Sequence, residues 1–223
     1  MVEGHPVVWL GIVGVVTAVA LGVPDPLASA ALTAALALSG LIARGPRAAS
    51  FVLGAAAALG CALVWLGWLF LVPTASVATW LTGALAAASV CLALGVAGQA
   101  VCAREWLSLA TLTGPFAPAL GWLCCGGEAA AELAARRRQG RRAGGLTGWL
   151  TTTRDLAEGL PGASPGRLLA LRGPDLAQLL ALALLAAAVV LRPQYGSLPL
   201  VAAALTLPLS LAVAMPRREA RSA

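Results

Sequence analysis

The sequence contains no lysine, a single histidine and few charged residues of any kind. Only 11% of its 223 residues are charged, and the fifteen strongly basic side chains are all arginine. A soluble domain usually carries about a quarter charged residues. With 60% apolar residues and a mean hydropathy of +0.88, the chain is predicted to be an integral membrane protein built from helices of roughly 20 residues.

These shortages also limit the chemistry. His5 is the only histidine, so a Ser-His-Asp or Cys-His set cannot form in the interior. No phosphate-binding loop of the Walker type and no glycine-rich dinucleotide fingerprint is present. Cys124 and Cys125 are adjacent and lack the two-residue spacer of common zinc and redox motifs. We therefore expect buried, inert thiols, no metal, no cofactor and no enzymatic activity in this chain.

No ionisable residue lies in the middle of a clear apolar run. This placement argues against a proton- or ion-coupled pump, in which intramembrane carboxylates mark the ion pathway. Asp25, between two prolines, is expected to form a turn or to cap the following helix. A small lipid-modifying enzyme remains an alternative only if the fold brings Asp25, Glu105 and Asp175 together.

The order of apolar runs is typical of an all-α, polytopic membrane helix bundle. Residues 107–125 are also long enough to cross a membrane, but Gly114-Pro115 and Pro118 interrupt them, so they either form a broken helix or lie at the interface. We divide the chain into membrane helices 1–4 (1–104), a basic insert (105–173), and membrane helices 5 and 6 with a basic tail (174–223). The clear apolar runs are 7–23, 27–43, 51–72, 77–102, 174–191 and 198–214.

Arginine placement predicts the topology. If both termini are cytoplasmic and 107–125 does not cross, about six helices span the membrane and fourteen of the fifteen arginines face the cytoplasm, as the positive-inside rule requires. Only Arg192 then faces out. If 107–125 crosses, there are about seven helices and the positive charge is split between the two faces. We favour the six-helix, multi-pass arrangement with an amphipathic helical insert on the cytoplasmic side.

The insert is the one long stretch that is not membrane-apolar, and residues 126–173 hold eight of the fifteen arginines. Residues 128–139 are predicted to be helical, because glutamates occupy the first turns and arginines the last, which complements the helix dipole. Glu132 and Arg136 are four residues apart and can pair on one helix face. The predicted basic interaction face comprises Arg136, Arg137, Arg141 and Arg142.

A second helix is predicted just after this basic face. Its large apolar side chains recur mostly at helix-face spacing and alternate with Thr153, Arg154, Asp155 and Glu158. This pattern indicates an amphipathic helix that lies on another surface. The predicted apolar face comprises Leu146, Trp149, Leu150, Leu156 and Leu160.

Three short motifs give this layout a family resemblance. Pro24-Asp25-Pro26-Leu27 follows the first membrane helix, Arg138-Gln139-Gly140 ends the basic helix, and Leu171-Arg172-Gly173 precedes a further membrane helix. Together they resemble the transmembrane T component of energy-coupling factor (ECF) importers, a family of ABC transporters. The resemblance implies a non-catalytic coupling subunit in a bacterial plasma membrane.

The same resemblance implies partners. Arg138, Gly140, Arg172 and Gly173 would contact ABC-type ATPase subunits, and the helix around Trp149 would pass their motion to a separate substrate-binding membrane protein. Membrane lipid is expected around the bundle, and no nucleic acid is expected. The alternative is a membrane scaffold or assembly protein whose arginine face binds anionic lipid or a soluble partner.

Overall fold

A computed structural model describes most of the membrane helices and part of the insert. Within the described residues the chain is helical and contains no strand, which confirms the all-α fold class. The described residues are 5–22, 25–43, 48–72, 76–101, 105–106, 109, 125–127, 129–130, 132–133, 136–137, 145–159, 171 and 173–214. The helices are α1 (Pro6–Gly22), α2 (Pro26–Ile42), α3 (Ala48–Leu71), α4 (Val77–Ala100), α7 (Gly145–Gly159), α8 (Gly173–Tyr195), α9 (Leu198–Ala204) and α10 (Thr206–Ala214).

Side chains cap the starts of α2 and α4. The Asp25 carboxylate accepts a hydrogen bond of 2.9 Å from the Leu27 N–H, and Pro26 occupies the first turn, where its missing N–H costs nothing. Ser76 accepts from the Thr79 N–H at 3.1 Å in the same way at the start of α4. The predicted capping role of Asp25 is therefore confirmed.

The C-terminal helices differ from the predicted runs at two points. α8 continues past Leu191 through Pro193 to Tyr195, because a proline in the last turn removes only one hydrogen bond. Gly196 then ends the helix with a φ of +66°, a conformation that favours glycine.

The last apolar run is split into two short helices by Leu205. Pro208 has no N–H and cannot donate to the carbonyl four residues earlier, so the helical ladder is interrupted at this point. The Thr206 hydroxyl donates to the Ala203 carbonyl at 2.6 Å and satisfies one acceptor at the break. The interruption therefore follows from a proline inside an otherwise apolar segment.

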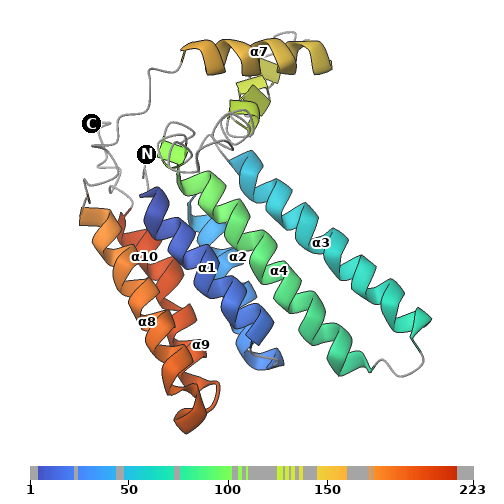
Figure 1. Cartoon of the computed structure of the whole chain (residues 1–223), viewed down its shortest axis with the longest axis vertical. Helices are drawn as coiled ribbons and strands as arrows, with labels where there is room; N and C mark the ends of the chain where they lie inside the picture. Colours follow the sequence, from blue (N-terminus) through green and yellow to red (C-terminus); the bar gives the residue numbers. More distant parts are fainter. Residues whose placement is uncertain are drawn as a thin grey trace, which may run out of the picture.

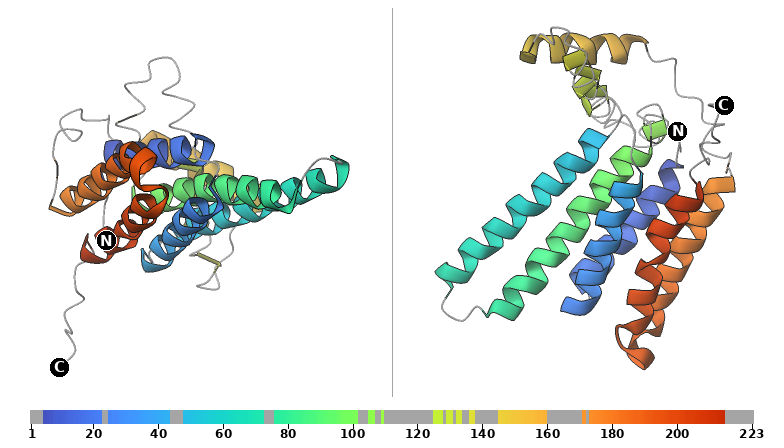
Figure 2. Two further views of the ribbon diagram at one scale, coloured as in Figure 1. Left: turned by 90° about the horizontal axis from the view of Figure 1, so that it is seen from below. Right: turned by 180° about the vertical axis from the view of Figure 1, so that it is seen from behind.

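The membrane helices lie side by side, with α1 and α2 between α4 on one side and the C-terminal helices α8, α9 and α10 on the other (Figure 1). α1 packs between α4 and α8, and α2 packs between α4 and the α9–α10 pair. α3 lies at the edge of the bundle and packs mainly on α4 (Figure 2), with the ring of Phe51 against Gly40 of α2. The hydrophobic core is centred on α1 and α2, with Ile12, Val16, Leu32 and Leu36 among its most buried side chains.

The α3–α4 contact depends on glycine. A Cβ atom added at Gly54 would lie 2.7 Å from the carbonyl oxygen of Cys91, and one added at Gly95 would lie 3.1 Å from that of Ser50. The two backbones therefore touch directly, as small residues permit between helices in lipid.

Three of the helices are long and apolar enough to cross a membrane: Ser50–Leu71, Val77–Ala100 and Asp175–Tyr195. Three shorter apolar helices, Pro6–Gly22, Pro26–Ile42 and Leu198–Ala212, accompany them. In lipid a helix satisfies its own backbone hydrogen bonds, so apolar helices of this length need no further partner there. These helices identify the chain as a membrane protein.

Candidate functional site: a helix across one end of the bundle

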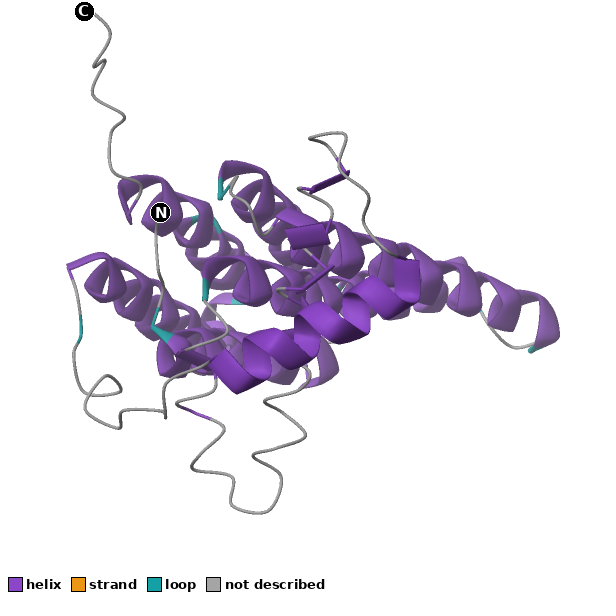
Figure 3. Ribbon diagram, turned by 90° about the horizontal axis from the view of Figure 1, so that it is seen from above, coloured by secondary structure: helices purple, strands orange, loops and turns teal. Residues whose placement is uncertain are grey.

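α7 lies across one end of the bundle instead of running along it (Figures 1 and 3). The start of α1, the end of α4, the start of α8 and the end of α10 are at this same end. The hairpin between α3 and α4 and the turn between α8 and α9 are at the opposite end. The described part of the insert is therefore gathered on a single face of the bundle.

Trp149 holds α7 against the helical residues that precede it. Its indole N–H donates to the carbonyl oxygen of Gly126 at 2.9 Å, and a Cβ added at Gly126 would lie 2.9 Å from the indole ring. Cys125, Ala129 and Leu133 are buried and recur every four residues, which places them on one helix face. The contact between the Trp149 indole and Gly126 therefore fixes α7 to the preceding helical residues.

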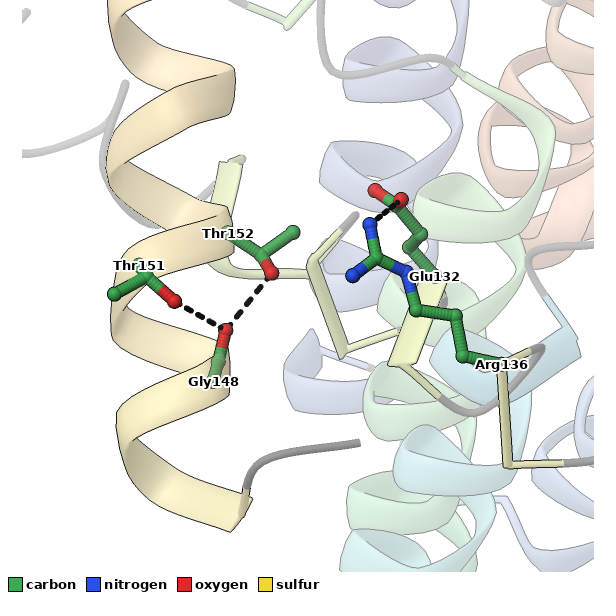
Figure 4. A network of polar contacts seen from close by, with 5 residues as sticks. All are labelled: Glu132, Arg136, Gly148, Thr151 and Thr152. Carbon is green, nitrogen blue, oxygen red and sulfur yellow. Dashed lines mark hydrogen bonds and ion pairs between the residues drawn. The ribbon is translucent and has the colours of Figure 1, made fainter. Parts of the chain in front are cut away.

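The buried side of α7 carries threonines whose hydroxyls are satisfied within the helix. Thr152 donates to the Gly148 carbonyl at 2.8 Å and Thr153 donates to the Trp149 carbonyl at 2.7 Å. Thr151, on the exposed side, also donates to Gly148 (Figure 4). Because these bonds stay inside the helix, Thr152 and Thr153 can be buried without a polar partner from elsewhere.

The predicted apolar face of α7 is divided between two environments. Trp149 and Leu156 are half-buried beside the threonines, whereas Leu146 and Leu150 are exposed at the edge of that side. Leu160 lies outside the described residues. Arg154 and Asp155 are exposed. Leu146 and Leu150 are one turn apart, so they form a small apolar edge next to a polar outer face.

The basic segment is described only in part. Every described residue between 125 and 137 is helical, as predicted for residues 128–139. Arg136 pairs with Glu132 one turn away, which confirms the predicted ion pair, and both side chains are partly exposed (Figure 4). Arg137 is exposed, and Gly173 is the first residue of α8. The other predicted contact residues, Arg138, Gly140, Arg141, Arg142 and Arg172, lie outside the described residues, as does nearly all of 107–125.

The carboxylates named for an enzymatic alternative do not come together. Asp25 caps α2 at the end of the bundle opposite α7, whereas Asp175 lies in the first turn of α8 at the α7 end (Figure 1). Among the described residues there is no group of three or more His, Cys, Asp and Glu side chains suited to a metal ion. The condition set for a lipid-modifying enzyme is therefore not met.

One buried polar cluster was not predicted. The His5 backbone N–H donates to the Asp175 carboxylate at 3.0 Å and ties the start of α1 to the start of α8. Gln178, about one turn farther along α8, is also buried. The signal in the sequence that could have predicted a buried polar contact here was Gln178, because an amide inside a run of leucine and alanine must be either buried in the protein or exposed to lipid.

The half-buried thiols of Cys61 and Cys91 lie 4.0 Å apart between α3 and α4, and Cys125 is buried. Cys102 and Cys124 lie outside the described residues.

A search of protein-family models, of curated proteins and of solved structures finds no match to this chain.

Proposed function

We propose that this chain is a non-catalytic coupling subunit of an ECF-type importer in the bacterial plasma membrane. The observation that carries the proposal is the position of α7, which crosses the end of the bundle where the insert leaves α4 and rejoins α8. A helix placed there can contact a soluble partner on one side and the membrane helices on the other.

The proposed topology has six membrane passes and two cytoplasmic termini. It counts the three long and three shorter apolar helices, with α9 and α10 taken as one pass. The arginine-rich insert and both chain termini then face the cytoplasm, while Arg192, in the last turn of α8, faces the other side. This distribution follows the positive-inside rule.

The proposed coupling uses two kinds of contact. Arg138 and Arg172 would bind ABC-type ATPase subunits through planar guanidinium groups, which form directional, charge-assisted hydrogen bonds. Movement of those arginines would reach α7 through the Trp149–Gly126 contact and α8 through Gly173. A separate membrane protein would supply the substrate site, so this chain itself would bind no cofactor.

Affinity purification in mild detergent tests the proposal. The tagged protein, isolated from its native host, is expected to retain one or two P-loop ATPases and a small hydrophobic partner, identified by mass spectrometry. The double variant Arg138→Glu/Arg172→Glu should lose the ATPases while the membrane bundle stays folded. Arg192→Glu is the matched control, because it reverses the same charge at the opposite end of the bundle and should retain them.

Two results would reject the coupling role. One is a clean preparation without an ATPase, from an extract in which other ABC complexes survive. The other is a double variant that retains the ATPases as well as the Arg192→Glu control does.

The second candidate is a membrane scaffold that binds anionic lipid. It is favoured by two arginines on the same short helical segment: Arg137 is exposed and Arg136 is partly exposed. A cluster of arginines near an anionic membrane surface gains about 1 kcal/mol per residue. Reconstitution into nanodiscs with and without anionic lipid distinguishes the two, since only the scaffold predicts that Arg136→Gln/Arg137→Gln changes lipid enrichment with no ATPase bound.

A further inference from the structure

Two thiols face each other across the contact between α3 and α4. The sulfur atoms of Cys61 and Cys91 lie 4.0 Å apart, and both side chains are half-buried. One S–H group donates a hydrogen bond to the other sulfur, so the two side chains point toward each other. A disulfide requires an S–S distance of about 2.05 Å. The two sulfur atoms therefore have to approach by only about 2 Å to bond.

The two helices are held close together on both sides of this thiol pair. A Cβ added at Gly54 would lie 2.7 Å from the carbonyl oxygen of Cys91 itself. Farther along the hairpin, the indole N–H of Trp80 donates to the carbonyl of Ala62, the residue after Cys61, at 3.4 Å. The backbones thus have no room to move closer, and rotation of the cysteine side chains between staggered positions has to bring the sulfurs together.

The depth of the pair in the membrane decides which oxidation chemistry can reach it. α3 lies at the edge of the bundle, and its apolar span Ser50–Leu71 buries little of its surface there (Figure 2). Cys61 and Cys91 lie near the middles of α3 and α4, about 13 Å or more from either helix end at 1.5 Å per residue. A charge at this depth is costly, so both groups stay as neutral S–H. Oxidation that begins with attack by a thiolate is therefore unfavourable here.

We propose that Cys61 and Cys91 form an oxidative modification site that lipid peroxyl radicals convert to a disulfide. Each peroxyl radical takes a hydrogen atom from one S–H group, which yields a lipid hydroperoxide and a sulfur-centred radical. The two sulfur radicals combine into one S–S bond, so two thiols and two peroxyl radicals give one disulfide and two hydroperoxides. Each sulfur is oxidised by one electron, each peroxyl radical is reduced by one, and no charged species forms in the hydrocarbon layer.

The disulfide acts on the helix that the bundle holds least. It ties the edge helix α3 covalently to α4, at a depth where unsaturated acyl chains lie against α3 and carry the radicals. The site does not rest on the proposed coupling role, because it requires no ATPase and no second membrane protein.

Peroxidation of the reconstituted protein tests the site. The full chain, purified with its thiols reduced, is placed in liposomes of polyunsaturated phosphatidylcholine and exposed to a lipophilic azo initiator that generates peroxyl radicals in the bilayer. Free thiols are blocked with maleimide, and disulfides are then reduced and labelled with an isotopically heavy maleimide. Chymotrypsin cuts after Trp65 and Trp68, which lie between the two cysteines, so mass spectrometry reads each thiol separately. Cys61 and Cys91 are expected to gain heavy label in equal amounts, several-fold above samples without initiator.

Moving one thiol tests whether the facing geometry is responsible. The double variant Gly60→Cys/Cys61→Ala keeps a cysteine at the same depth on α3 but turns it by about 100° around the helix. It then points into open space, because a Cβ at Gly60 meets nothing within 4 Å among the described residues. Heavy label at Cys91 should fall several-fold in this variant.

Three results would overturn the proposal. One is heavy label at Cys91 in the double variant equal to that in the native chain. Another is a native chain whose Cys61 and Cys91 stay free, or become acids that thiol reductants do not restore, while lipid hydroperoxides accumulate. The third is heavy label that appears only in chains cross-linked to a second copy on a non-reducing gel.

Discussion

α2 and α3 are both apolar, uncharged helices, yet they occupy opposite positions in the bundle. α2 packs against α4, α9 and α10, whereas α3 packs mainly on α4 and touches α2 only near Phe51, among the described residues. Leu36 of α2 is 0% exposed and Leu53 of α3 is 66% exposed. Mean hydropathy does not separate the two helices, because lipid and protein interior are almost equally apolar. What separates them is the shape of the contacts that each helix makes.

The contacts themselves differ in kind. α3 meets α4 through backbone contact at Gly54 and Gly95. α2 meets α4 through larger apolar side chains and through a hydroxyl pair, Thr33 and Ser89, whose oxygens are 2.9 Å apart. The packing of α3 on α4 therefore requires glycines, which let the two backbones approach. The packing of α2 on α4 requires side chains that fill the space between the helices. Substitutions on the two helices should reveal this difference.

The largest effect is expected from Gly54→Leu. Its Cβ alone would approach a backbone oxygen within 2.7 Å, and backbone cannot move aside as a side chain can. We expect α3 to separate from α4, at a cost of about 3 kcal/mol or more. Urea or SDS titration in mixed micelles measures the loss, and accessibility of Cys61 and Cys91 to a small maleimide reports the opening.

Gly60→Leu is the matched control on the same helix, because a Cβ at Gly60 meets nothing within 4 Å. It should leave both stability and thiol accessibility close to those of the native chain. Equal losses in Gly54→Leu and Gly60→Leu would show that α3 responds to leucine in general and not to the glycine contact.

The next effect compares the same truncation on the two helices. Leu36→Ala opens a cavity in the core and should destabilise the bundle by about 2 kcal/mol or more. Leu53→Ala removes a lipid-facing side chain and should change stability by less than about 0.5 kcal/mol. Equal losses in the two variants would mean that α3 is covered in the native assembly, for example by a partner protein.

The smallest effect is expected from Thr33→Val on α2. This change keeps the shape of the side chain and removes the hydroxyl that bonds the Ser29 carbonyl and pairs with Ser89. Interhelical hydrogen bonds in membrane proteins average about 0.6 kcal/mol, so a loss of that order is expected. Thr82→Val, whose hydroxyl bonds only the Ala78 carbonyl within its own helix among the described residues, should be neutral. A loss above about 2 kcal/mol in Thr33→Val would indicate a larger polar network.

Much of the fold was predictable because apolar runs and their interruptions determine membrane helices. The capping role of Asp25 and the Glu132–Arg136 pair also followed from sequence, since both act within a turn or two of the chain. The continuation of α8 through Pro193 and the break at Leu205 were not predicted, because proline ends a helix or interrupts it depending on its distance from the helix end.

The candidate site was predictable only in its local features. The amphipathic pattern identified α7, but the partner of Trp149 is Gly126, 23 residues earlier, and no local rule specifies that contact. The His5–Asp175 bond spans 170 residues and depends on which helices become neighbours. The roles of Arg138, Gly140 and Arg172 stay predictions.

The unequal lengths of the helices have a consequence for the surrounding bilayer. α3 and α4 have 24 residues each, whereas α1 and α2 have 17, so their lengths are about 36 Å and about 26 Å. A typical hydrocarbon layer is about 30 Å thick and adapts to mismatch by thinning or by helix tilt. Lipids beside α9 and α10, where the crossing segment is also short, would have to compress, while α3 would tilt. The protein would therefore sit in an asymmetric annulus and favour thin membrane on one flank only.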